Sequence, residues 1–394
     1  MIEFKNVDVV FGEQPERALP LIDENISLQE IKDSMGLTTA VRSANLKVNK
    51  GEICVLMGLS GSGKSSLLRT ANGLNPITRG QILIETEDGI KDFHALNESE
   101  RRDARMNTIT MVFQKFALMP WLTVAENVGF GLEQKGLDKK TIRKKVTHQL
   151  ELVGLAEWAD KRPDELSGGM QQRVGLARAF AMETDIILMD EPFSALDPLI
   201  RSQLQDELLR LQAQLNKTVI FVSHDLDEAL KLGNHLAIMT DGEIVQHDTP
   251  ENIVLNPAND YVRDFVAHTN PVHVVNAKAL MTPLSQFKEV DNRLLLSKRS
   301  DCWLEMDTEA QEYHLQYGDG RRLNVISWSG EDPIESLASL PVCVNANTKM
   351  YDVMALRYQT GHGVLVADNQ GKVLGYIGDR DIYHAMLGKL IADD

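Results

Sequence analysis

Short apolar runs that alternate with helix-like segments are the main pattern in the first part of the chain. Residues 52–57, 184–189 and 218–223 are rich in apolar side chains, as expected for strands that are covered on both faces of a sheet. Residues 198–215 lie between the last two runs and repeat their apolar side chains with a helical period. This alternation of helices with short buried strands predicts an α/β layered domain.

Segments of other character surround these runs. Residues 2–11 alternate loosely and are rich in β-branched side chains, as in an edge strand. Residues 12–40 form a mainly polar insert that contains a helix-like stretch, and residues 140–182 favour helices. Residues 238–245 carry an Asp-Gly pair in their middle and predict a hairpin. An antiparallel part and a helical part are therefore expected beside the layered sheet.

The pattern of predicted elements changes after residue 271. Residues 272–394 contain short strands and helices without a second phosphate-binding pattern. Their best-formed piece is a strand at 363–368, a turn, a second strand at 372–377 and a helix from Asp379. We place a domain boundary near 268–275, which divides the chain into domains at 1–270 and 271–394.

The charge balance limits the kinds of partner. Of 394 residues, 57 are acidic and 41 basic, which gives a net charge of -16. Such a surplus of carboxylates opposes extended contact with nucleic acid or an anionic membrane surface. No window reaches the ~18–20 consecutive apolar residues of a membrane-spanning helix, and the N-terminus lacks the pattern of a secretory signal. We expect a cytoplasmic protein that reaches a membrane only by docking on a partner.

Cysteine usage agrees with that compartment. The three cysteines, Cys54, Cys302 and Cys343, are widely spaced and lack the pairing of metal ligands. This pattern indicates a reducing environment without a disulfide framework, and each cysteine is expected as a small core residue.

A glycine-rich loop follows the strand at 52–57 and leads into a helix-like segment. It reads Gly58-Leu-Ser-Gly-Ser-Gly-Lys-Ser-Ser66 and matches the P-loop pattern. Glycines let the backbone approach phosphate oxygens closely, so that successive N–H groups face the negative charge. Lys64 is expected to reach the β- and γ-phosphates, and the Ser65 hydroxyl to bind Mg²⁺. The predicted phosphate-binding residues are Gly58, Ser60, Gly61, Ser62, Gly63, Lys64, Ser65 and Ser66.

Two carboxylates end the apolar strand at 186–189. Asp190 is placed to hold Mg²⁺, because hard cations prefer oxygen ligands. Glu191 is then placed to orient or deprotonate the water that attacks the γ-phosphate. An acidic pair at a strand end can also cap a helix, but the P-loop earlier in the chain favours ATP hydrolysis.

The segment Leu166-Ser-Gly-Gly-Met-Gln-Gln-Arg173 resembles the signature motif of ABC transporter ATPases. The resemblance implies a P-loop ABC nucleotide-binding domain with an antiparallel β subdomain and a helical subdomain at 115–180. It also implies roles for three further positions. Gln114 matches the glutamine that senses Mg²⁺ and the attacking water, residues 194–197 match the D-loop, and His224 matches the switch histidine that contacts the γ-phosphate.

The same resemblance implies a head-to-tail homodimer. In the family, the signature motif of one subunit faces the nucleotide held by the P-loop of the other, so one chain alone makes no complete site. Residues implied to contact ATP in this way are Ser167, Gly168, Gly169, Gln171 and Asp197. An aromatic side chain near the first strand usually stacks on adenine, and Phe11 matches that position best, although Phe4 could compete and Phe11 could serve core packing instead.

Over almost its whole length the chain resembles ATPases of bacterial importers for quaternary ammonium osmolytes. The insert at 12–40 and the segments 58–60, 116–120 and 193–198 carry this likeness. Three further segments, 72–76, 126–131 and 229–233, resemble the choline-importer ATPases most, with glycine betaine or proline betaine importers as the alternative. The resemblance implies integral membrane permease subunits, an extracytoplasmic substrate-binding protein and a peripheral place on the cytoplasmic face of the bacterial inner membrane. Residues 116–130 are expected to form part of the groove that receives the permease.

Residues 271–394 resemble a small α/β regulatory domain of the CBS type. Residues 362–368 and 373–382 fit its repeat, whereas a first repeat from Asn276 is degenerate. The domain could sense ionic strength or a nucleotide, or it could be a dimerising or inert remnant.

Two other functions compete with the importer ATPase. Soluble ABC ATPases that act on nucleic acid or ribosomes usually carry two ATPase halves or a long coiled-coil insertion, and this acidic chain has one set of motifs. A purely regulatory adaptor would not need Lys64, Asp190, Glu191 and His224 to be intact.

Overall fold

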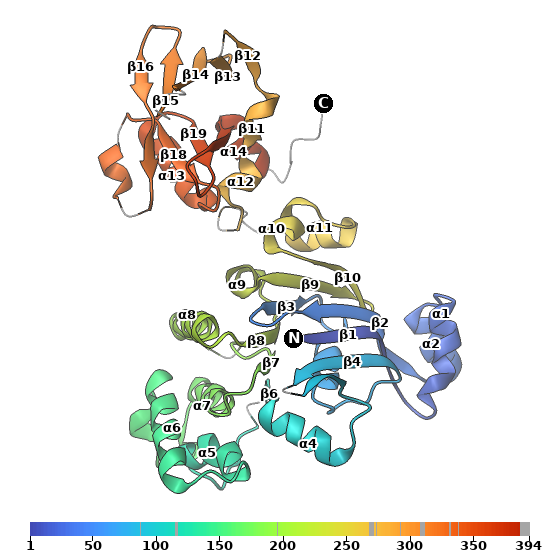
Figure 1. The fold of residues 1–394 in the computed structure, drawn as a ribbon. Coiled ribbons are helices and arrows are strands. Elements are labelled where there is room, and N and C mark those ends of the chain that lie inside the picture. Colours follow the sequence, from blue (N-terminus) through green and yellow to red (C-terminus); the bar gives the residue numbers. More distant parts are fainter. Residues whose placement is uncertain are drawn as a thin grey trace. The chain divides into compact units, whose positions relative to one another are not determined.

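In the computed structural model, the apolar run before the glycine loop becomes β3 (Ile53–Met57), a central strand of a six-stranded sheet (Figure 1). All residues of β3, β7 and β8 are buried, as their apolar sequences predict. The sheet order is β10-β9-β3-β8-β7-β6, parallel except for the edge strand β10. Its other strands are β6 (Ile109–Val112), β7 (Ile186–Asp190), β8 (Thr218–Val222), β9 (His235–Thr240) and β10 (Glu243–Asp248).

The structure describes residues 1–86, 88–114, 117–194, 196–267, 272, 274–291, 293–307, 312–330, 332–337 and 339–386. The chain divides into two compact units, one made of Met1–Ile253 with Ala258–Val262, the other of Val254–Pro257 with Arg263–Asp394. The predicted domain boundary near 268–275 includes residues outside the described ranges. The helices α10 (Pro250–Leu255) and α11 (Asp260–Val266) contain the residues at which the chain passes from one unit to the other.

A four-stranded antiparallel sheet completes the β layers of the first unit. Its order is β2-β1-β4-β5, with β1 (Ile2–Phe11), β2 (Thr38–Val48), β4 (Arg79–Thr86) and β5 (Gly89–Asp92). Its inward side chains, such as Phe4 and Leu46, share one buried cluster with Leu56 of β3 and Leu188 of β7. The two sheets therefore enclose a common core.

The insert between β1 and β2 folds into helices with their own small core. They are η1 (Pro15–Ala18), α1 (Leu19–Asp23) and α2 (Leu28–Met35). Ser27 and Glu30 form a capping box at the start of α2, which satisfies the free N–H groups there. Arg79 of β4 ties the insert to the sheet, because its guanidinium bonds both the buried Asp8 and Asp23 of α1. A polar sequence stretch is thus an ordered element.

Three helices form the helical part of the first unit. They are α5 (Val124–Gln134), α6 (Lys139–Leu152) and α7 (Gly168–Ala181), seen at the lower left of Figure 1. The remaining helices of this unit are α3 (Lys64–Thr70), α4 (Glu98–Asn107), α8 (Pro198–Leu215) and α9 (Leu226–Leu232). The start of the predicted helical subdomain, at Lys115 and Phe116, lies outside the described residues.

The second unit contains a five-stranded sheet of order β11-β20-β19-β18-β17. Its strands are β11 (Thr282–Pro283), β17 (Ile326–Trp328), β18 (Val342–Asn345), β19 (Val364–Ala367) and β20 (Val373–Ile377), and its helices are α12 (Ala277–Leu280), α13 (Met350–Thr360) and α14 (Asp379–Met386). The succession β18-α13-β19-β20-α14 includes the strand–turn–strand–helix piece that the sequence predicts.

A separate five-stranded antiparallel meander interrupts this unit between β11 and β17. It consists of β12 (Lys288–Val290), β13 (Arg293–Ser297), β14 (Cys302–Asp307), β15 (Glu312–Tyr317) and β16 (Arg322–Asn324) in sequential order. The sequence patterns do not predict this sheet. The meander follows α12, close to Asn276, where the sequence predicts a degenerate first CBS-like repeat, and that repeat stays a prediction.

All three cysteines are buried and unbridged, as expected for core residues. Burial raises the pKa of Cys302 and of Cys343 to about 11, and it raises the pKa of Cys54 further. The thiolate, which is the reactive form, is therefore suppressed at neutral pH.

Candidate nucleotide-binding and hydrolysis site

The loop at 58–66 connects β3 to α3 and depends on glycines at its close approaches. Gly63 has φ 98° and a Cβ atom there would collide with the carbonyl oxygen of Ala40. Gly58 has φ 142° and packs in the same way against the carbonyl of Met239. A side chain at either position would push the loop away from its neighbours, so both positions need glycine.

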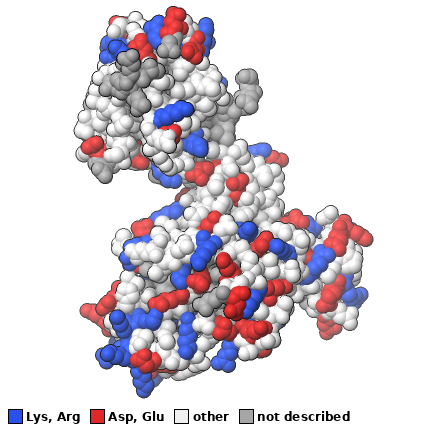
Figure 2. Space-filling view, in the orientation of Figure 1, with Lys and Arg blue, Asp and Glu red and all other residues white. Residues whose placement is uncertain are grey.

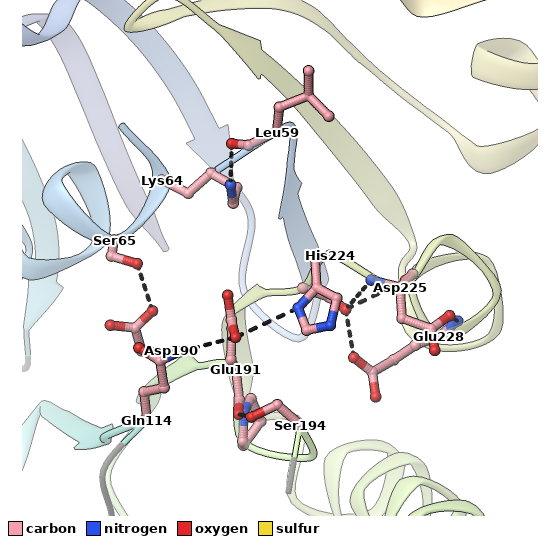
Figure 3. Close-up of polar contacts among 12 residues, drawn as sticks. Leu59, Lys64, Ser65, Gln114, Asp190, Glu191, Ser194, His224, Asp225 and Glu228 are labelled. Atoms are coloured by element: carbon pink, nitrogen blue, oxygen red, sulfur yellow. Dashed lines mark hydrogen bonds and ion pairs between the residues drawn. The ribbon is translucent and has the colours of Figure 1, made fainter. Parts of the chain in front are cut away.

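Lys64 directs its ammonium group back into this loop. Its Nζ donates to the carbonyl oxygen of Leu59 at 2.9 Å (Figure 3). It also donates to the carbonyl oxygen of Gly58 at 2.9 Å and to Ser62 Oγ at 3.3 Å. Burial lowers the pKa of Lys64, and the charges of Glu191 and Asp190 act in the opposite direction. The Lys64 ammonium group thus lies among the backbone groups of the loop that is predicted to bind phosphate.

Ser65 and Asp190, predicted as magnesium ligands, lie together. Ser65 Oγ donates to Asp190 Oδ1 at 2.8 Å, and Asp190 is fully buried at the end of β7. Their oxygens are the donor type that Mg²⁺ prefers, so the two residues fit that cation. The other carboxylate oxygen of Asp190 accepts from Arg69 Nη2 at 2.9 Å, a contact that the sequence analysis missed. Arg69 follows Ser65 by four residues on α3, a spacing that could have identified it.

Gln114, Glu191 and His224 converge on a single oxygen atom. Gln114 Nε2 donates to Glu191 Oε2 at 3.0 Å, and His224 Nδ1 lies 3.4 Å from the same oxygen (Figure 3). The three residues follow β6, β7 and β8, which are neighbouring parallel strands, so their side chains meet at one edge of the sheet.

The backbone of Glu191 is strained. Its φ of 48° lies in the left-handed region, which costs a non-glycine residue of order 1–3 kcal/mol. Three contacts hold this conformation at both ends of the residue: Glu191 N donates to Val222 O at 3.1 Å, while Ser194 N and Oγ donate to Glu191 O at 3.4 and 3.0 Å. These contacts keep the backbone of Glu191 in its strained conformation, and in this conformation the carboxylate faces Gln114 and His224.

Comparisons with known proteins identify the family of this chain. A family model described as ABC transporter matches residues 41–194. Over 395 aligned residues the chain is 42% identical to the glycine betaine/proline betaine transport system ATP-binding protein ProV of Salmonella typhimurium, which covers 98% of this chain and 97% of ProV. The chain belongs to the ABC transporter ATP-binding family.

Within that family, the protein groups with the subunits named for glycine betaine and other quaternary amines. It is 47% identical over 280 residues to the glycine betaine transport ATP-binding protein OpuAA of Bacillus subtilis, which covers 71% of this chain and 66% of OpuAA. A dimeric structure of the ATP-binding cassette MJ0796, in a post-hydrolysis state with ADP and Pi, covers 64% of this chain and 99% of that cassette, with a TM-score of 0.54 and 31% identity. This ABC ATPase is an ATP-hydrolysing subunit.

The signature residues of this ABC ATPase lie apart from its own P-loop contacts. Ser167 caps α7 by accepting from Met170 N at 3.3 Å, and Gly168 and Gly169 form the first turn of that helix. Gln171 Nε2 donates to Pro163 O at 2.8 Å. Among the described residues, no hydrogen bond or ion pair joins these residues to residues 58–66.

Asp197 and Phe11, the last two predicted contacts, have local roles that leave them accessible. Asp197 Oδ1 accepts from Ile200 N at 3.0 Å and caps α8. Phe11 ends β1 and is 40% exposed, and its stacking on adenine stays a prediction.

Proposed function

We propose that this ATPase energises uptake of a quaternary ammonium osmolyte, and that the residues described above form its nucleotide site. The relatives named for glycine betaine support the transport role, and the convergence of Gln114 and His224 on the Glu191 carboxylate supports the nucleotide site. A carboxylate held by two polar partners beside a P-loop is suited to orient a water molecule and accept its proton.

The roles follow from position. The backbone of residues 58–66 and the Lys64 ammonium group bind the β- and γ-phosphates of ATP, and Phe11 stacks on adenine. Ser65, Asp190 and Gln114 would hold Mg²⁺, which would supply positive charge to neutralise the phosphate oxygens. Glu191 accepts the proton of the attacking water, and His224 contacts the γ-phosphate.

A second copy of the chain completes each site in this proposal. Ser167, Gly168, Gly169, Gln171 and Asp197 of one subunit then contact the ATP held by the other, which gives a head-to-tail homodimer. The dimeric state of the MJ0796 cassette supports this arrangement. Closure on ATP and opening after hydrolysis couple the reaction to transport.

For the transported compound we propose glycine betaine or proline betaine ahead of choline. The sequence favours choline, but the relatives reported above are named for glycine betaine or proline betaine, and one of them aligns over almost the whole chain. All three compounds carry a quaternary ammonium group, whereas only the betaines also carry a carboxylate. Selection between them belongs to the substrate-binding protein and the permease.

Among the described residues, no helix is long and apolar enough to cross a membrane. Family membership supports docking on integral permease subunits at the cytoplasmic face of the bacterial inner membrane. Trp121, in the predicted groove at 116–130, is 69% exposed and is suited to such a contact, whereas Phe116 lies outside the described residues. Acidic and basic side chains are interspersed on the face seen in Figure 2, which does not suit nucleic acid.

The C-terminal unit is proposed as a regulatory domain, with β18-α13-β19-β20-α14 as its complete CBS-like repeat. Deletion of residues 276–394 distinguishes a sensor of ionic strength, whose loss changes the salt response of ATP hydrolysis, from a dimerising or inert unit.

Reconstituting the chain with its permease and substrate-binding protein tests the transport proposal. ATP hydrolysis should rise with glycine betaine or proline betaine at lower concentration than with choline. Stronger stimulation by choline would restore the choline assignment, and no stimulation by any of the three would overturn the quaternary ammonium proposal.

A further inference from the structure

The residue before His224 belongs to a buried hydrogen-bond network. Ser223 is 2% exposed, and its Oγ donates to Glu228 Oε2 at 2.5 Å. Glu228 is itself 8% exposed, and its Oε1 accepts from Gln205 Nε2 of α8 at 2.9 Å. Ser223 Oγ also accepts from the Asp225 N–H at 3.0 Å. The network thus fixes the backbone on both sides of His224.

A second link joins the same segment to α8. Asp225 Oδ1 accepts from Glu228 N at 3.1 Å and caps α9, while Asp225 Oδ2 lies 3.1 Å from Arg201 Nη1. Arg201 and Gln205 are four residues apart, so they project from one face of α8. Two successive turns of this helix therefore hold the segment that carries His224.

His224 needs such support, because its side chain is 64% exposed. Packing cannot fix the direction of an imidazole in water, so its aim at Glu191 Oε2 depends on the backbone of Ser223 and Asp225. Glu228 does not contact Glu191 or the P-loop in any described hydrogen bond or ion pair.

We propose that Glu228 is a positioning residue for ATP hydrolysis, acting through Ser223 to aim His224 at Glu191 and the γ-phosphate. This inference rests on the proposed role of His224. Burial raises the pKa of the Glu228 carboxyl, and the hydrogen bonds from Ser223 and Gln205 act in the opposite direction.

The hydrogen-bond chemistry predicts different results for two substitutions. In Glu228→Gln, the amide nitrogen can donate to Ser223 Oγ and the amide oxygen can still accept from Gln205, so both contacts survive. In Glu228→Ala, Ser223 and Gln205 lose their shared partner. A general packing role would be damaged by both changes to a similar degree.

A double-mutant cycle on the full-length chain tests the proposal. Leaving buried polar groups without a partner should lower kcat for ATP about tenfold in Glu228→Ala, with KM for ATP unchanged, while Glu228→Gln keeps most of the activity. Because Glu228 acts through His224, adding Glu228→Ala to His224→Ala should cause no further loss of kcat. The exposed neighbour on α9 provides the control Asp227→Ala, which should leave kcat unchanged.

Two failures of this experiment are distinguishable. If His224→Ala keeps normal turnover, the proposed site itself is wrong. If His224→Ala loses turnover and Glu228→Ala lowers the remaining turnover by the same factor as in the wild type, only the positioning role is overturned. Should Glu228→Ala not fold, Ser223→Ala takes its place in the cycle with the same expected result, because it removes the hydroxyl that links Glu228 to the backbone.

Discussion

Arg69 and Asp190 form an ion pair in which 2.9 Å separate Arg69 Nη2 from Asp190 Oδ2. The aspartate is fully buried, whereas the arginine is 41% exposed. A buried carboxylate is costly without a partner, and this arginine supplies one.

Removing the Arg69 guanidinium should therefore lower the free energy of unfolding, and a metal ion bound at Asp190 should reduce this effect. We expect Arg69→Ala to lower the free energy of unfolding by about 1 kcal/mol, a modest value because the arginine is partly exposed. Addition of Mg²⁺ with ATP should narrow the difference from wild type in urea unfolding. Arg102→Ala, at an exposed arginine of α4, is the control. Equal effects of the two substitutions would contradict the prediction.

Glu191→Gln should separate ATP binding from hydrolysis. The amide keeps the size of the side chain and its contact with His224, but it cannot accept the proton of the attacking water. We expect turnover to fall by roughly 10²-fold or more, while ATP binding persists and an ATP-bound dimer accumulates in size-exclusion chromatography. The control is Glu157→Gln at an exposed position. Near-normal turnover of the Glu191 variant would remove this residue from the mechanism.

The stability of the protein should depend on pH through Glu228. Its pKa is raised in the folded state by burial, with the negative Asp225 adding to that shift and the positive Arg201 opposing it. Stability from the neutral carboxyl is complete below the ordinary glutamate pKa and is lost as pH rises through the higher folded pKa. Glu228→Gln cannot ionise, so its stability relative to wild type should increase from pH 4 to pH 8, measured by urea unfolding at ~pH 4 and ~pH 8. A constant difference would contradict this assignment.

The C-terminal unit should affect regulation more than basic catalysis. Deleting residues 276–394 is expected to spare basal ATP hydrolysis but to change its response to salt in the reconstituted transporter. A milder variant, Tyr317→Phe, removes the hydroxyl that lies 2.6 Å from His362 Nδ1 and so links the meander to the loop before β19. The deletion should shift the salt response strongly and Tyr317→Phe partly. An unchanged salt response after deletion would exclude a sensing role.

Local sequence patterns were sufficient for part of the site. The strand–loop–helix context of Lys64 and the strand before Asp190 are encoded in adjacent residues, and the structure has β3, α3 and β7 at those places. The meeting of Gln114, Glu191 and His224 is different, because it depends on the order β8-β7-β6, which no single segment contains. Family resemblance rather than periodicity anticipated that these three residues act together.

Elements with weak local signals were missed. The strands of the meander are short, and β12 and β16 contain only three residues each, too few to establish a period of two. The network of Ser223, Glu228 and Gln205 was missed for another reason. Gln205 and Glu228 are polar residues of a kind that is ordinary on a helix surface, and only the contact between α8 and α9 makes them buried partners.

The position of the meander limits how the C-terminal unit could be shortened. It leaves the sheet after β11 and returns at β17, which are the two opposite edges of the order β11-β20-β19-β18-β17. Four interstrand spacings separate these edges, or about 19 Å. A chain that bypassed residues 288–324 would need roughly six extended residues to cover that span. The meander thus connects the two edges of the sheet. If β11 were fused directly to β17, one of these two edge strands could not keep its place in the sheet.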